Sequence, residues 1–229
     1  MAQVRVPDGT NEITQADAIL DTVEIPAGES VLVTLDAAHT QRETAEYIGG
    51  KPRWDFLMTV KGNQPSLQRE VFDKILPLLA GTPHDVTEEH DRGRIKRRSC
   101  WITSAEGIDF PHARQTAIIR REIFEISGGR ISKEHALILT SRKAEKMTAA
   151  DVNRHIRGHW GIENKSHYVR DTVYREDNSQ AWAENGPHAL ASLRNLTLGL
   201  FRLKNMNSIK ETTEWICRDR MRALQFMTT

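Results

Sequence analysis

The sequence contains little cysteine and no long hydrophobic segment. Its two cysteines, Cys100 and Cys217, lie far apart and outside any CxxC spacing. This arrangement excludes a disulfide-built scaffold and a thiolate zinc site, and it is typical of a reducing compartment. The apolar runs, such as VLVTL and ALILT, are too short to cross a bilayer. The N-terminus has neither a basic start before an apolar stretch nor a small-residue cleavage site, so we expect a cytoplasmic protein without a membrane partner.

Positively charged residues are scarce in the first part of the chain. Residues 1–91 carry 7 Lys and Arg against 16 Asp and Glu, whereas residues 92–229 carry 25 against 15. The formal net charge of +1 hides this asymmetry. The basic part is suited to phosphate groups, although it can equally neutralise the acidic part within the fold. At 229 residues the chain is long enough to bury one sizeable core.

Two continuous apolar stretches, 31–35 and 54–60, predict buried strands. A helical pattern follows each of them, at 40–48 and 65–80. This alternation predicts an α/β fold with a mostly parallel sheet covered by helices. Asp36 follows the first strand directly, at the sheet edge where α/β proteins bind their ligands. The alternative is that Asp36 only caps the turn or helix that comes next.

The pattern changes between residues 84 and 140, where shorter, polar-flanked strands are joined by turns such as Gly128–Gly129. A helix is then expected to begin near Thr148, with Asp151 in capping-box spacing. A later leucine row at helical spacing predicts an amphipathic helix that faces the core. Its members are Leu190, Leu193, Leu196, Leu200 and Leu203.

The helix that begins near residue 148 carries a row of four side chains spaced four residues apart, namely His155, His159, Glu163 and His167. Such a row can hold a divalent cation or a phosphate, with or without DNA chemistry, or it can form a solvated stripe of paired charges. His155 and His159 have HxxxH spacing, but the interior glutamate of HExxH is missing, which argues against a metalloprotease. The residues alone leave the role of Glu163 open.

Five sequence blocks resemble bacterial insertion-sequence transposases of the DDE type, particularly the H-repeat-associated group, in order and rough spacing. The blocks are TLDAAHTQRETAEYI, FLMTVKGNQPSL, HDRGRIKRR, IRGHWGIENKSHYVRDTVYREDNSQ and NGPHALASLRNLTLGLFRL. The resemblance covers nearly the whole chain. It implies a partial RNase H-like core whose first strands are missing, with a β-rich insertion and C-terminal helices. The expected segments are 1–83 (first core part), 84–140 (insertion), 141–207 (core completion) and 208–229 (tail).

The resemblance implies metal-dependent DNA cleavage and strand transfer at insertion-sequence ends. In that family three carboxylates hold two Mg²⁺ or Mn²⁺ ions, which suits the oxygen preference of these metals. Asp36 resembles the second acid and Glu163 the third, so both are expected to be catalytic metal ligands. His159 and Arg170 resemble cations that steady the phosphate backbone. Ile156 and His159 replace the first two residues of the commoner Tyr–Arg–Glu–Lys pattern.

Further DNA contacts are expected from basic and amide side chains. The motif VKGNQ lies near the active site in the family, although a strand-ending turn around Gly62 explains it equally well. The motif RGRIKRR, residues 92–98, predicts a strand with one basic face, which either contacts phosphates or is merely solvated. The residues predicted to contact DNA are Lys61, Asn63, Arg94, Lys96, Arg97, Arg157, His159, Lys165 and Arg170.

The first acid of the family is not evident in this sequence. In the family it lies in an Asp-Gly-Lys-like context well upstream of the NEI block, whereas here only ten residues precede that block. Asp8–Gly9 is superficially similar, but its position favours a turn. Two functions therefore remain open: an enzyme subunit, or a non-catalytic remnant that binds DNA or full-length transposase as an inhibitor. Because the missing strands would leave a sheet edge exposed, homo-oligomerisation is a further expectation.

Overall fold

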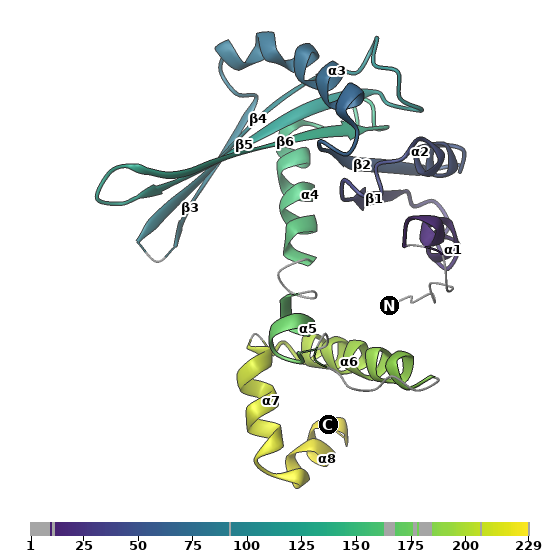
Figure 1. The fold of residues 1–229 in the computed structure, drawn as a ribbon, viewed down its shortest axis with the longest axis vertical. Helices are drawn as coiled ribbons and strands as arrows, with labels where there is room; N and C mark the ends of the chain where they lie inside the picture. Colours follow the sequence, from purple (N-terminus) through teal and green to yellow (C-terminus); the bar gives the residue numbers. More distant parts are fainter. Residues whose placement is uncertain are drawn as a thin grey trace. The chain divides into compact units, whose positions relative to one another are not determined.

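Figure 1 shows the computed structural model of the chain, which forms two compact units, residues 2–159 and residues 160–229. Each unit is considered by itself. The structure describes residues 10, 12–91, 93–162, 168–175, 178, 185–206 and 208–228.

The N-terminal unit contains a six-stranded sheet. In chain order the strands are β1 (Val31–Leu35), β2 (Trp54–Val60), β3 (Asp85–Asp91), β4 (Arg94–Ser104), β5 (Gln115–Glu125) and β6 (Arg130–Thr140). They lie side by side in the order β1-β2-β6-β5-β4-β3. Only β1 and β2 are parallel, and the other neighbours are antiparallel. The α/β class is confirmed, but the prediction of a mostly parallel sheet is wrong, because β3 to β6 form hairpins that join the sheet through β6.

The strands of the hairpin region are longer than the sequence pattern predicts. β4, β5 and β6 each have eleven residues. β4 pairs with β5 along its full length, so the polar outer ends of both strands are also hydrogen-bonded within the sheet. The predicted turn between β5 and β6 is confirmed, because Gly128 and Gly129 both have positive φ, which only glycine adopts readily. Strands β1 and β2 match the predicted stretches 31–35 and 54–60.

Helices cover both faces of the sheet. In Figure 1, α3 (Pro65–Ile75) lies above the sheet and α4 (Ala149–Ile162) lies below it. Helix α2 (Arg42–Gly49) contributes Ala45 and Ile48 to the same hydrophobic core as α3. The short elements η1 (Glu12–Gln15) and α1 (Ala16–Leu20) precede β1, and η2 (Leu76–Ala80) follows α3.

Alternate residues of the strands build the two buried layers. On β2, Phe56, Met58 and Val60 join one hydrophobic core with Val71 and Ile75 of α3. Successive strand residues point to opposite faces, so the buried Leu57 belongs to the other face. Each fully buried aliphatic side chain of this kind stabilises the fold by about 1.5–3 kcal/mol. Because both faces of β2 are buried, its sequence is a nearly continuous apolar run rather than an alternating one.

The predicted capping box at the start of α4 is confirmed. The backbone N–H of Thr148 donates to Asp151 Oδ2 at 2.9 Å, and the Asp151 N–H donates to Thr148 Oγ1 at 3.3 Å. These bonds satisfy N–H groups that the first helical turn leaves unpaired. The hydrogen bond from the Thr148 backbone is also the main cause that lowers the pKa of Asp151.

The C-terminal unit consists of helices in its described part. They are α5 (Tyr168–Thr172), α6 (Gly186–Leu203), α7 (Ile209–Cys217) and α8 (Arg220–Thr228). Val169, Leu198, Phe201 and Ile209 form its buried cluster. None of the helices in the described part of the chain has both the length and the apolar character needed to span a bilayer.

Helix α6 forms as predicted, but the face that it buries is a different one. Leu193, Leu196 and Leu203 are 57%, 69% and 82% exposed. The buried residues are Leu198 and Phe201, which lie on the opposite side of the helix at about 100° per residue. Helical spacing of leucines identifies an apolar face but cannot tell which of two such faces is covered.

Candidate functional site at the carboxyl edge of β1 and β2

Asp36 lies exposed directly after β1. Its Oδ1 accepts a hydrogen bond from the backbone N–H of His39 at 3.2 Å. The carboxylate therefore stabilises the turn before α2, as the capping alternative predicts. Because a carboxylate has two oxygens with several lone pairs, this bond still leaves capacity for a metal ion or a further donor.

The Asp36 turn is fixed to the neighbouring strand. Since β1 and β2 are parallel with Leu35 opposite Met58, the ends of both strands meet at one edge. The buried Thr40 hydroxyl lies 2.7 Å from the carbonyl oxygen of Thr59 and 3.0 Å from that of Asp36. A single side chain thus joins the turn to β2.

The loop after β2 holds the same turn from the other side. Asn63 Nδ2 donates to the carbonyl oxygen of Ala37 at 2.7 Å. Gln64 Nε2 donates to the Thr40 carbonyl at 2.9 Å and to Gln41 Oε1 at 3.1 Å. We call Asn63 and Gln64 the amide clamp. The predicted DNA contact Asn63 thus uses its amide donor inside the fold, next to Asp36. The clamp role of Gln64 was missed, and its position in the motif VKGNQ was the only signal for it.

Two further predicted residues reach this edge. Lys61 is exposed at the end of β2. His159, on α4, places Nδ1 3.1 Å from Thr34 Oγ1, two residues before Asp36. The structure therefore places Asp36, Lys61 and Asn63 at the carboxyl ends of β1 and β2, and His159 beside the end of β1. Glu163 and Lys165 lie outside the described residues, and Arg170 is half-buried in α5 of the C-terminal unit.

The other predicted DNA contacts lie on or against the hairpin strands. Lys96 Nζ is 2.8 Å from Asp91 Oδ2, and Arg97 forms an ion pair with Glu88. Arg94 is exposed on the same strand face as Lys96, but Arg97 points to the opposite face because strand side chains alternate. Residues 93–98, which the structure describes, thus present cations on both faces rather than on one.

Arg157 reaches from α4 to the hairpin strands. Its guanidinium forms an ion pair with Glu89 of β3. One turn earlier the buried Asn153 donates to Asp85 Oδ2 at 2.5 Å. Strand β3 therefore holds α4 through two polar contacts. The position of Arg157 is set by β3, not by the turn that contains Asp36 at the carboxyl edge of β1 and β2.

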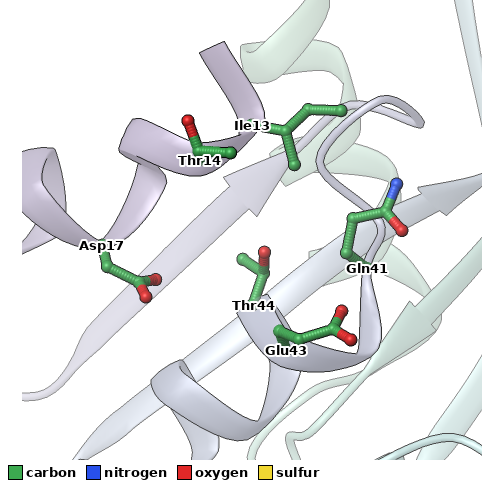
Figure 2. Close-up of a pocket in the computed structure, with 6 residues that line it drawn as sticks. All are labelled: Ile13, Thr14, Asp17, Gln41, Glu43 and Thr44. Atoms are coloured by element: carbon green, nitrogen blue, oxygen red, sulfur yellow. The ribbon is translucent and has the colours of Figure 1, made fainter. Parts of the chain in front are cut away.

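A pocket of about 430 Å³ adjoins the Asp36 turn on the α2 side. Figure 2 shows its lining, which consists of Ile13, Thr14, Asp17, Gln41, Glu43 and Thr44. Burial raises the pKa of Asp17, and the nearby Asp21 acts in the same direction. No pattern in the sequence marks this pocket. Asp36 does not line this pocket.

The side chains at this edge determine whether a metal ion can bind there. Among the described residues, no group of three or more His, Cys, Asp and Glu side chains is arranged to hold a metal ion. Mg²⁺ is often bound through only one or two carboxylates, together with water and substrate phosphates. Asp36, an exposed carboxylate at the edge, fits the role of one such ligand.

Comparisons with known proteins identify the family. The family described as "Transposase DDE domain" matches residues 1–200. The chain is 27% identical over 214 residues to the "H repeat-associated putative transposase YhhI" of Escherichia coli K12, covering 87% of this chain and 54% of that protein. It is equally similar to the "Putative transposase YncI" of Escherichia coli O157:H7, with 88% and 53% covered.

The chain spans about half the length of these curated relatives. The family match, in contrast, covers most of the 229 residues. Members of this family generally depend on a divalent metal. The resemblance stated from the five sequence blocks is confirmed: the chain belongs to the family of DDE transposase domains.

Proposed function

We propose that this chain binds DNA and a divalent metal at the carboxyl edge of β1 and β2, as part of DNA cleavage and strand transfer at insertion-sequence ends. The observation that carries the proposal is the location of Asp36 and Lys61, exposed directly after the parallel strands β1 and β2, with His159 bonded to Thr34 of β1. The family match supplies the reaction class. The parallel pair β1–β2, with a helix after each strand, also supports an RNase H-like core.

The proposed chemistry is phosphodiester hydrolysis followed by attack of the freed 3′-hydroxyl on a second strand. Asp36 and Glu163 would hold Mg²⁺ or Mn²⁺, which when bound stabilises charge on the attacking and leaving oxygens. Lys61 and His159, which lie near the ends of β2 and β1, are proposed to steady backbone phosphates. The amide clamp keeps the Asp36 turn in place before substrate arrives.

The polypeptide of residues 1–229, taken by itself, is proposed to bind DNA without cleaving it. The family uses three carboxylates, and only Asp36 and Glu163 match the family pattern in this sequence. Removing one member of a concerted catalytic set lowers the rate by orders of magnitude.

Metal binding tests the shared carboxylate site. Titration of Mn²⁺, followed by the electron paramagnetic resonance signal of the free ion, should show weaker binding in Asp36→Asn and in Glu163→Gln. A loss of about tenfold or more is expected for each, since even outer partners of metal ligands cost 10–100-fold. Asp73→Asn removes an exposed carboxylate on α3 and is the matched control. Equal Mn²⁺ affinity in all three variants and the wild type contradicts the shared site.

DNA binding is tested by fluorescence anisotropy with a labelled duplex at low and moderate salt. We expect affinity that falls as salt rises, because neutralised phosphates release counterions. A nicking assay on the same DNA with Mg²⁺ or Mn²⁺ should show no product from the 229-residue polypeptide. Absence of binding at low salt overturns the proposed function, whereas metal-dependent nicking overturns the claim that this polypeptide alone is inactive.

A further inference from the structure

Three arginines gather on the sheet face next to α4, away from the Asp36 edge. Arg98 of β4 and Arg121 of β5 are directly opposed cross-strand neighbours. Residues that pair in this way share one face of the sheet, and like charges directly opposite each other are destabilising. Arg157 of α4 adds a third guanidinium, because it forms an ion pair with the same Glu89 that Arg98 approaches.

Two carboxylates accompany the three guanidiniums among the described residues. Glu89 Oε1 lies 3.4 Å from Arg98 Nη1 and is also the partner of Arg157. Glu134 Oε2 lies 3.0 Å from Arg121 Nη1, but the Glu134 side chain is 59% exposed, so water screens this pair. The cluster therefore keeps one uncompensated positive charge.

Arg98 is buried without enough acceptors. Its side chain is only 10% exposed. Within the described part of the chain its Nε and Nη1 atoms, and the Nε of Arg121, are buried and lack a hydrogen-bond partner. Burial disfavours the charged form and lowers the pKa of Arg98, while the Glu89 charge opposes this effect. An arginine nevertheless stays charged in proteins, so its buried N–H groups require hydrogen-bond acceptors.

We propose that Arg121 and Arg157, with the buried Arg98 behind them, form a seat for one phosphate group of a DNA backbone. The guanidinium fork matches the geometry of phosphate oxygens, and one bound phosphate balances the spare charge of the cluster. Arg157 forms the outer side of the seat, since its side chain is 58% exposed. The seat reads no base, so it adds affinity without sequence preference. This inference rests on the proposed function, because it takes DNA as the ligand.

The test uses variants whose side chains reach the protein surface. Arg157→Gln and Arg121→Gln each remove one charge from the seat while Arg98 remains in place. Arg154→Gln is the matched control, because Arg154 lies on the same helix, is 69% exposed and pairs with Asp151 instead. Anisotropy with a 25-base-pair duplex across a salt series gives the affinity and the slope of log K against log salt. Circular dichroism melting checks that all variants fold.

The expected result is a smaller salt slope in the two seat variants, by about 0.9 for one lost phosphate contact, and an unchanged slope in Arg154→Gln. The double variant Arg121→Gln/Arg157→Gln should lose little more than either single variant, because both arginines serve one phosphate. Equal slopes in the seat variants and in Arg154→Gln, with DNA binding intact, overturn the seat and leave the proposed function standing.

Inorganic phosphate separates this inference from the proposed function. Millimolar phosphate should raise the melting temperature of the wild type more than that of Arg157→Gln, at constant ionic strength. If phosphate binds in this way but duplex DNA does not bind at low salt, the proposed function fails and the seat holds a free anion. If neither binds, both are overturned.

Discussion

The inner and outer parts of the sheet are held together by different interactions. Around β1, β2 and the end of β6, uncharged amide, hydroxyl and carbonyl groups join the loops, and the ion pair Arg142–Asp55 has side chains only 17% and 20% exposed. Along the outer ends of β3 and β4, partly exposed ion pairs such as Lys96–Asp91 and Arg97–Glu88 join the strands. Directional bonds fix one geometry, whereas exposed ion pairs tolerate variation. The candidate site at the carboxyl edge of β1 and β2 lies in the inner part, where directional hydrogen bonds hold the loops.

The largest effect is expected for Asp55→Ala in the inner part. Asp55 accepts hydrogen bonds from Ser141 Oγ at 2.8 Å and from Arg142 Nε at 3.2 Å. Its removal leaves a mostly buried arginine unpaired and should lower the free energy of unfolding by about 3 kcal/mol. Urea unfolding measures the change. The control is Asp109→Ala, whose carboxylate is 84% exposed and pairs with Arg42, with an expected loss under about 1 kcal/mol. Equal losses in the two variants contradict the claim that the buried ion pair contributes more to stability than an exposed one.

A smaller effect is expected for the amide clamp. Asn63→Asp keeps the size of the side chain but loses the N–H donor to the Ala37 carbonyl, at a cost of about 1 kcal/mol. The loss should also speed hydrogen exchange of the amides of residues 37–41, because the turn loses a fixed contact. If Asn63→Asp matches the wild type in unfolding free energy and in exchange, the clamp does not hold the turn.

The smallest effect is expected in the outer part. Lys96→Ala and Arg97→Ala each break an ion pair whose partners are partly exposed. The free energy of unfolding should change by no more than about 0.5 kcal/mol, and added salt should reduce the change further. A loss near that of Asp55→Ala would show that the outer strands depend on their charges as strongly as the inner part depends on its buried pair.

The sequence allowed the local elements to be predicted more fully than their assembly. The stretches 31–35 and 54–60 and the capping box at Thr148 depend on neighbouring residues, and all three are confirmed. The pairing of β6 with β2 was not predictable, because it joins residues about eighty positions apart. The mixed sheet follows from that single pairing.

In the candidate site too, individual residues were easier to predict than the contacts between distant strands. Asp36 and His159 were identified from motifs, and the structure places both at one edge, although their roles stay predictions. The pairing of Lys96 and Arg97 with acids of β3 was missed, since a basic run alone does not reveal what lies across the strand. The opposition of Arg98 and Arg121 likewise depends on strand register, which composition does not encode.

The exposed leucines of α6 affect the solubility of the C-terminal unit when it is expressed without the N-terminal unit. Three leucines on one side of the helix are more than half exposed, while Leu198 and Phe201 occupy the other side. Large exposed apolar side chains at regular spacing promote self-association in water. A separately expressed fragment of residues 160–229 should therefore come out of solution at lower concentration than the fragment that contains the sheet. Polar substitution of Leu196 and Leu203 is the direct way to keep it soluble.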